Sequence, residues 1–167
     1  IRIQDPDKRR AIADLMPEMA WIGTCPVFLL FCGDSRRIRR LGQLRGHEFA
    51  NDHLDAFLNA AVDTALVMQN FITAAEAAGL GCCPISVVRN HIDRIAEITN
   101  LPDYVFPVAG MCLGHPSHSG FTSTRLPPEM VVHTDQYDDS QLPAQIDAYD
   151  RRRDGIYHIP TEKYRMT

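Results

Sequence analysis

The pattern of apolar and polar residues in the first part of the chain predicts two strands and one helix. Residues 1–4 alternate strictly, which indicates the end of a β-strand. Asp5 can cap the following helix with its side-chain oxygen, and Pro6 suits the first helical position because no N–H is needed there. Helical spacing gives this helix one apolar face, formed by Ile12, Leu15, Met16 and Met19. The unbroken apolar run of residues 25–31 predicts a buried strand.

The middle of the chain predicts a polar excursion and then the longest helix. Residues 36–46 contain five arginines and are expected to form an exposed polar segment. A helix starts at residues 51–52 and runs through Ala75, with apolar residues around nearly its whole circumference. This pattern is typical of a central helix packed on all sides. Gly79 and Gly81 supply the backbone geometry that ends it.

The rest of the chain predicts two more strands, a second helix and a polar tail. Residues 82–86 are short and extended, Asn90 caps a helix that ends at Ile98, and residues 104–113 form a second apolar strand. A loop, the short apolar run 130–133 and a polar tail follow. Two long helices between short strands, without regular βαβ alternation, predict an α+β fold rather than a doubly wound sheet.

Composition narrows the class of protein. A chain of 167 residues with 45% hydrophobic and 23% charged residues is typical of one soluble globular domain, not of a disordered or fibrous chain. A net charge of −4 argues against a nucleic-acid partner, although 15 of the 17 basic residues are arginines, which bind phosphates and carboxylates well. The apolar stretch 64–75 is too short to span a membrane, so no membrane partner is expected.

The cysteines and histidines point to neither a disulfide framework nor a metal site. Five cysteines without a Cys-x-x-Cys pair, in a sequence that opens without a secretory signal, predict a cytoplasmic location. Adjacent residues such as Cys82 and Cys83 rarely reach disulfide geometry. Pro116 prevents His115 and His118 from sharing one helix face, so no metal is expected there.

Three segments carry candidate chemistry, each with an ordinary alternative. At residues 79–86 a helix ends, and a short strand and a new helix follow within a few residues, so backbone N–H groups could face a ligand there. Spacing alone favours the ordinary alternative, a helix cap followed by an edge strand. Arg125 could bind a phosphate, but a solvated loop arginine is commoner. The arginines of residues 36–45 are better explained as a solvated surface than as a nucleotide or nucleic-acid site.

Taken in order, several strings resemble the flavin-dependent nitroreductase family. They are VDTALVMQN (62–70), AAEAAGLG (74–81), IS (85–86), RN (89–90), LP (101–102), VAGMCLGHP (108–116) and RLP (125–127). The resemblance runs from Ile1 to about Tyr137 and is strongest to the oxygen-insensitive NADPH nitroreductase and NADPH–flavin oxidoreductase branch. Each string is weak alone, but their joint order is specific and reverses the ordinary interpretation of residues 79–86 and Arg125.

The resemblance implies an FMN enzyme that uses NADPH as hydride donor. It implies a mixed, largely antiparallel sheet flanked by helices, with a long central helix, in an intertwined homodimer that holds two flavins at the subunit interface. Residues 1–167 would form a single domain, with residues 138–167 as an extended C-terminal arm. Reduced FMN would pass electrons to a nitroaromatic, a quinone or a free flavin in a ping-pong cycle. Because the cofactor carries the chemistry, no residue of the chain is expected to act as a catalytic acid, base or nucleophile.

The resemblance also assigns site residues. Pro84, Ile85 and Ser86 match the strand whose backbone faces the isoalloxazine ring and donates toward its N5 and O4 edge. Arg125 matches the loop arginine that binds the FMN phosphate. Candidates for the 2′-phosphate of NADPH are Arg151, Arg152, Arg153, Lys163 and Arg165.

The sequence departs from the family pattern at several places. Ser123 stands where a lysine is common two residues before the phosphate-binding arginine, and Ser86 and Val87 stand where glycines are common. The family's N-terminal Arg-Ser-x-Arg flavin-phosphate motif would precede Ile1, so we expect family residues to be missing at both ends. These departures leave one alternative open: a non-catalytic dimeric relative that has lost tight FMN binding and acts as a binding or regulatory module.

Overall fold

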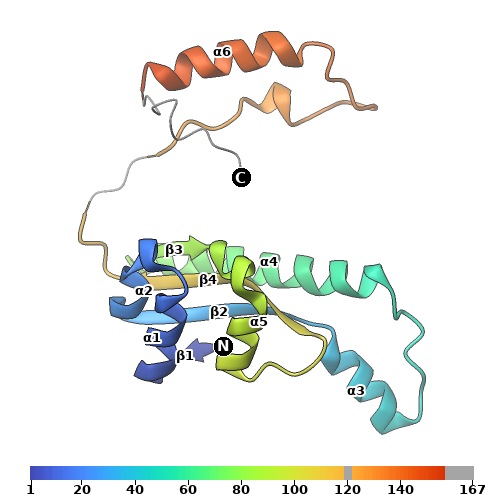
Figure 1. Cartoon of the computed structure of the whole chain (residues 1–167). Helices are drawn as coiled ribbons and strands as arrows, with labels where there is room; N and C mark the ends of the chain where they lie inside the picture. Colours follow the sequence, from blue (N-terminus) through green and yellow to red (C-terminus); the bar gives the residue numbers. More distant parts are fainter. Residues whose placement is uncertain (119–121, 157–167) are drawn as a thin grey trace. The chain divides into compact units, whose positions relative to one another are not determined.

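The computed structural model describes residues 1–118 and 122–156 (Figure 1). The chain forms two compact units, Ile1–His118 and Ser119–Thr167. The first unit contains the sheet and most of the helices, and the second contains one longer helix. That residues 1–167 act as a single domain stays a prediction.

Four antiparallel strands form the sheet of the first unit, in the order β1 (Arg2–Ile3), β2 (Val27–Asp34), β4 (Val105–Gly114) and β3 (Gly81–Ile85). The predicted strands are all present, and the predicted α+β class is confirmed. β2 begins two residues later than predicted because Cys25 still donates its N–H to the carbonyl of Trp21, at the end of a short helix.

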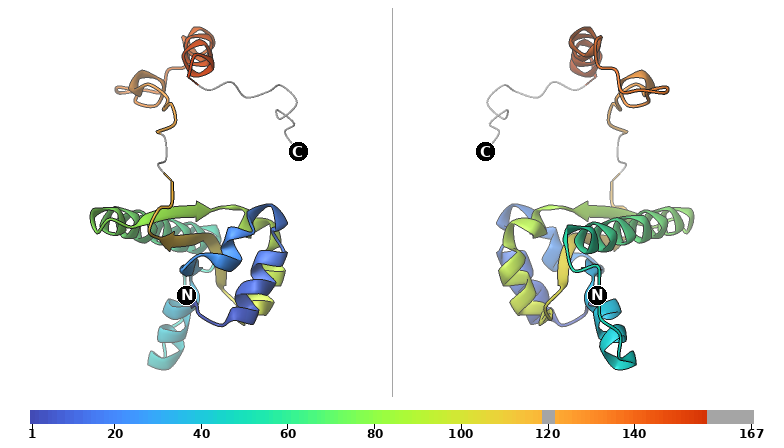
Figure 2. Two further views of the ribbon diagram at one scale, coloured as in Figure 1. Left: turned by 90° about the vertical axis from the view of Figure 1, so that its left-hand side faces the viewer. Right: turned by 90° about the vertical axis from the view of Figure 1, so that its right-hand side faces the viewer.

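Helices cover both faces of this sheet (Figures 1 and 2). α1 (Pro6–Asp14), α2 (Trp21–Thr24) and α5 (Ile92–Thr99) lie together on one face, and α4 (Leu54–Ala77) runs along the other. The predicted cap of α1 is confirmed, because Asp5 Oδ1 accepts from the N–H groups of Asp7 (2.9 Å) and Lys8 (3.2 Å). The core lies on the α1 face and consists of Ile3, Ile12, Met16, Ile22, Phe28, Leu30, Ile85, Val88, Ile95 and Cys112.

Local details of three predicted segments were wrong. The arginine-rich polar excursion is a helix, α3 (Arg36–Arg45), because arginine is a good helix former; Gly46 ends it at φ 71°. α1 ends before Leu15, and a 3₁₀ turn, η1 (Pro17–Met19), follows it. Asn90 caps no helix, because a second 3₁₀ turn, η2 (Val87–His91), leads directly into α5.

α4 is not packed on all sides by the described part of this chain. It starts after His53, whose Nδ1 accepts from the Asp55 N–H, and Gly79 (φ 77°) follows its end. Within it, three residues are buried: Ala56, Thr64 and Ala75. Its exposed apolar residues are Leu54 (78% exposed), Phe57, Leu58, Val62, Leu66 (62%) and Val67. Leu54, Leu58, Val62 and Leu66 follow one another at four-residue spacing and are here called the apolar face of α4, whereas Phe57 stacks on Phe106 and Val67 lines a cavity of the first unit. The prediction of a helix packed all round therefore fails for the single chain.

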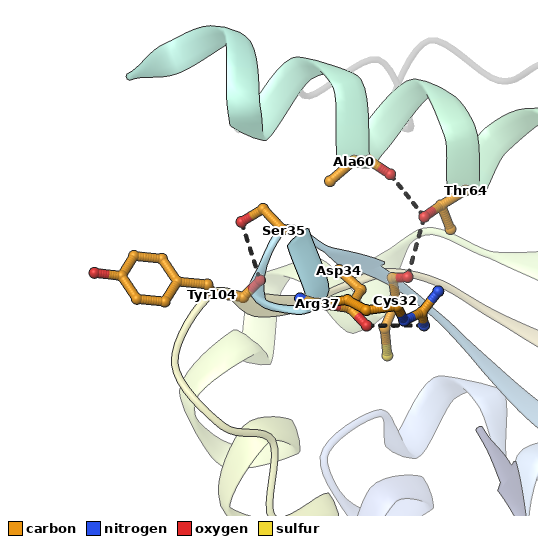
Figure 3. Close-up of polar contacts among 7 residues, drawn as sticks. All are labelled: Cys32, Asp34, Ser35, Arg37, Ala60, Thr64 and Tyr104. Atoms are coloured by element: carbon orange, nitrogen blue, oxygen red, sulfur yellow. Dashed lines mark hydrogen bonds and ion pairs between the residues drawn. The ribbon is translucent and has the colours of Figure 1, made fainter. Parts of the chain in front are cut away.

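Side-chain hydrogen bonds attach α3 and α4 to the sheet (Figure 3). The Thr64 hydroxyl lies 3.0 Å from the carbonyl oxygen of Cys32 on β2 and 2.8 Å from that of Ala60 in its own helix. At the end of β2, the Ser35 hydroxyl and N–H both donate to the carbonyl of Tyr104. These bonds fix the start of α3 and the middle of α4 against the sheet.

A β-bulge interrupts the pairing of β2 with β4 near the Thr64 contact. Phe31 pairs with Ala109, but Cys32 pairs with Pro107, so Val108 is the extra residue on β4. Leu30 exchanges both of its backbone hydrogen bonds with Ile1, on the side of β2 that faces away from β4. Cys32, two residues further on, points its carbonyl to that same side, where the Thr64 hydroxyl lies 3.0 Å from it. The carbonyl of Val108 accepts from Arg89 Nη1 at 2.7 Å. The Val108 carbonyl at the bulge is thus satisfied by a side chain from another element.

The second unit has a 3₁₀ turn, η3 (Pro128–Met130), and a helix, α6 (Leu142–Asp154). The sequence predicted only a polar tail here, because the helix has no clear apolar face. Pro143 in its first turn and Gly155 after its end nevertheless mark its limits.

Candidate functional site

The predicted flavin-facing strand is the edge strand β3. Pro84 and Ile85 belong to it, and Ser86 follows it directly. Ile85 is 2% exposed, belongs to the core and is paired with Gly110 of β4. Ser86 is exposed, and its carbonyl accepts from the Arg89 N–H at 3.0 Å. Thus Pro84 and Ser86 are accessible in this chain, whereas Ile85 is buried.

Proline at position 84 determines which backbone groups face the open edge. Pro84 lies opposite Met111 on β4 but has no N–H to donate, so its nitrogen faces away from β4. Main-chain groups of alternate strand residues point to the same side, and the N–H of Ser86 therefore points to the open edge as well. No acceptor for this N–H lies among the described residues. Ser86 is consequently the available donor of the predicted triplet.

The end of β3 is held in place by Arg89. Its guanidinium reaches the carbonyl of Val108 at the bulge of β4, while its backbone N–H closes the turn at Ser86. Val88, between them, is fully buried. The Ser86 N–H is therefore presented from a turn that is anchored on both sides.

Arg125, the predicted phosphate ligand, lies in the second unit. Its side chain is exposed, and Nη1 donates to the Ser123 hydroxyl at 3.0 Å. In the described residues, no carboxylate forms an ion pair with it. The serine that replaces the family's common lysine thus orients the guanidinium but adds no charge. The predicted ring-facing strand and the predicted phosphate ligand come from different units.

The three arginines near the end of α6 have different surroundings. Arg153 contacts the carboxylates of Asp150 (3.4 Å) and Asp154 (3.2 Å). Arg152 donates to the carbonyl of Arg125 at 2.7 Å. Arg151 is exposed and has no polar partner among the described residues. Of these three candidates for the NADPH phosphate, Arg151 is the one whose guanidinium is uncommitted, and Lys163 and Arg165 lie outside the described residues.

The thiols and histidines of the described residues show no second reactive centre. Cys83 lies opposite Cys112 across β3 and β4, and burial, with a hydrogen bond to Cys25, raises the pKa of the Cys112 thiol far above its ordinary value. All five cysteines are free. No group of three or more His, Cys, Asp or Glu side chains in residues 1–118 and 122–156 could hold a metal ion.

A cavity of the first unit lies apart from β3. It has a volume of about 1020 Å³ and is lined by β2, α3, α4 and the loop after α5. Phe31, Val67 and Phe71 contribute apolar surface, and Arg36 and Arg37 contribute charge. The sequence missed this cavity because it did not predict α3, which forms one of its walls. None of the predicted site residues lines it.

A small aromatic clamp fixes the loop that joins α3 to α4. The Arg39 guanidinium lies between the rings of Phe49 (4.4 Å) and Tyr104 (4.1 Å) and contacts Asp52 at 2.6 Å. This hydrogen bond holds the pKa of the Asp52 carboxyl below its ordinary value. Arg39 is therefore committed to structure, and the interpretation of this arginine cluster as a solvated surface is wrong for Arg39, whose side chain is only 13% exposed.

No helix among the described residues combines the length and apolar character required to cross a bilayer.

Comparison with known proteins matches the chain to two family profiles. Residues 4–115 match the profile described as "Nitroreductase family", and residues 123–165 match the one described as "Nitroreductase family, C-terminal domain". The boundary between the two matches falls at the boundary between the two compact units.

Relatives and a solved structure agree with these matches. An FMN reductase [NAD(P)H] from Bacillus subtilis is 37% identical over 91% of this chain and 62% of its own length. An oxygen-insensitive NADPH nitroreductase from Salmonella typhimurium is 36% identical over 88% of this chain and 60% of its own length. The structure of the NADPH:FMN oxidoreductase from Vibrio harveyi complexed with NAD⁺ has a TM-score of 0.85 at 32% identity, covering 94% of this chain and 66% of that one. The chain spans about three fifths of the length of the two relatives.

Proposed function

Because the chain belongs to the nitroreductase family, we propose that it forms part of an FMN-dependent oxidoreductase that takes hydride from NADPH. The observation that carries the proposal is that both family profiles match this chain, in order along the sequence. Relatives of the chain are named as an FMN reductase and a nitroreductase. The acceptors would be nitroaromatics, quinones or free flavin. When bound, FMN would accept hydride from NADPH and pass electrons to the second substrate in a ping-pong cycle.

Each unit, taken by itself, offers a group of a type that binds FMN. The exposed Ser86 N–H, which lacks an acceptor among the described residues, suits the electron-rich N5 and O4 edge of the ring. Pro84 is exposed but has no N–H to donate, and Ile85 is buried. The Arg125 guanidinium keeps free N–H groups for the phosphate while Ser123 holds one of them. Arg151 is the favoured ligand for the NADPH 2′-phosphate.

The proposed enzyme is a homodimer that uses the apolar face of α4. Six apolar side chains of this helix are about half exposed or more in the single chain, which is unusual for a long apolar helix. Burial against a second copy would remove them from water and bring the helix to the central position that its sequence predicts. A cytoplasmic location is proposed with it, because the five cysteines are free.

A visible absorption spectrum tests the proposal. Purified protein should retain added FMN, lose the flavin absorbance when NADPH is added without oxygen, and regain it when a quinone is supplied. Protein that takes up no FMN, and whose melting temperature FMN does not raise, would support the non-catalytic alternative instead. Ser123 is the feature that favours this alternative, because it removes one positive charge from the phosphate site.

Arg125→Ala tests the phosphate ligand. Loss of hydrogen bonds from a charged group, about 1.5–3 kcal/mol, should weaken FMN binding roughly 10- to 150-fold. Riboflavin, which has no phosphate, should bind as it does to the unchanged protein. Arg45→Ala, an exposed arginine at the end of α3, is the matched control. Equal affinities of the Arg125→Ala protein and the control for FMN would place the phosphate elsewhere.

A further inference from the structure

α6 holds the backbone around Arg125 from one face. The Tyr149 hydroxyl donates to the carbonyl of Thr124 at 3.1 Å, and Arg152 Nη2 donates to the carbonyl of Arg125 at 2.7 Å. The two side chains are three residues apart in the helix, so they project from the same face. The Arg152 guanidinium also lies 5.5 Å from the centre of the Tyr149 ring. Two consecutive carbonyls of the loop are thus bound by a stacked pair of side chains.

A third contact orients the side chain of Arg125 itself. Ser123 Oγ accepts from Arg125 Nη1, so the backbone is held on one side and the guanidinium on the other. The bonds from Tyr149 and Arg152 link residues that are 25 and 27 positions apart in the sequence, beyond the reach of any local turn. A loop fixed in this way has less freedom to lose when it binds an anion.

We propose that Tyr149 and Arg152 are positioning residues that hold Arg125 ready for the phosphate of FMN. The inference rests on the proposed function, because it takes the FMN phosphate as the ligand of Arg125. In this inference Arg152 acts through the Arg125 carbonyl, to which its Nη2 donates. Its charge adds to the positive potential at the same loop.

Two conservative variants test the positioning role. Tyr149→Phe removes one hydroxyl and keeps the ring, and Arg152→Gln removes the charge and the bond to the Arg125 carbonyl. Each should weaken FMN binding, by roughly 3- to 10-fold for Tyr149→Phe and more for Arg152→Gln, while riboflavin binding stays unchanged. Matched controls are Tyr137→Phe, whose ring is 75% exposed in the same unit, and Arg45→Gln. Flavin fluorescence titration gives the dissociation constants.

A double-mutant cycle separates positioning from an independent effect. If Tyr149 acts through Arg125, then Tyr149→Phe should cost nothing further in FMN affinity once Arg125 is alanine. A second readout needs no flavin. Trypsin should cleave after Arg125 several-fold faster in the two α6 variants than in their controls, because the loop is no longer held.

The outcomes distinguish this inference from the proposed function. If Arg125→Ala weakens FMN selectively but the α6 variants change neither FMN affinity nor cleavage after Arg125, the positioning role is wrong and the phosphate site stands. Equal losses for FMN and riboflavin would reduce Tyr149 and Arg152 to general structural residues, which also overturns the inference. If Arg125→Ala leaves the preference for FMN over riboflavin intact, the proposed phosphate site fails and this inference fails with it.

Discussion

Thr64 should contribute more to stability than its place on a largely exposed helix suggests. Its side chain is buried, and its hydroxyl lies 3.0 Å from the carbonyl oxygen of Cys32 on β2. Thr64→Val keeps the β-branched shape and nearly the same helix propensity but removes the donor. The Cys32 carbonyl would then lose its hydrogen bond beside the bulge.

The expected cost follows from the burial of that carbonyl. An unsatisfied buried acceptor costs about 1–3 kcal/mol, and Cys32 is half-buried, so we expect about 1–2 kcal/mol. Thr64→Ser is the matched control, because it keeps the hydroxyl and loses one methyl group, worth about 0.8 kcal/mol. The valine variant should therefore be the less stable of the two.

Urea unfolding followed by circular dichroism measures this difference. All proteins are compared at one concentration, since assembly would alter apparent stability. The midpoint should fall for Thr64→Val while the slope stays constant. A valine variant as stable as the unchanged protein, or a serine variant less stable than the valine one, would refute the role of the hydroxyl.

Three further predictions concern charge, thiols and assembly. The Asp52→Asn variant should be less stable than the unchanged protein at neutral pH, because Arg39 lowers the folded-state pKa of Asp52. This difference in unfolding free energy should persist above the ordinary aspartate pKa of about 3.9 and disappear as the pH falls through the folded-state pKa of Asp52. Urea unfolding at a series of pH values measures it. Iodoacetamide should label exposed Cys83 in the native protein and reach Cys112 only after unfolding, as mass spectrometry will show; rapid native labelling of Cys112 would contradict its raised pKa and burial. Leu66→Glu, at a position 62% exposed, should leave the fold intact and shift the protein toward monomer in analytical ultracentrifugation, whereas an unchanged mass would exclude this part of α4 from the interface.

Local signals in the sequence were sufficient for most elements. The Asp5 cap, the apolar runs that became β2 and β4, and the glycine after α4 each depend on residues close together in the chain, so spacing and turn chemistry identify them. α3 and α6 were missed because a helix with many arginines or little apolar periodicity resembles a polar loop in sequence.

The family resemblance placed the candidate site, but the roles of its residues needed the tertiary structure. The sequence offered Pro84, Ile85 and Ser86 together; only the register of β3 on β4 indicates that Ser86 has the available donor. It offered Arg152 as a ligand for NADPH, while the structure commits its guanidinium to the Arg125 carbonyl.

The sequence by itself determined the α+β class, the main strands and helices, and the family of the chain. The tertiary structure decided how the bulge at Val108 is satisfied, which face of α4 stays uncovered, and which arginines are free to bind an anion. Helix and strand formation follows residues a few positions apart, whereas a hydrogen-bond partner is chosen by what long-range packing brings within about 3 Å. Thr64 and Cys32 lie 32 residues apart, and the residues around them in the sequence do not predict the hydrogen bond between the Thr64 hydroxyl and the Cys32 carbonyl.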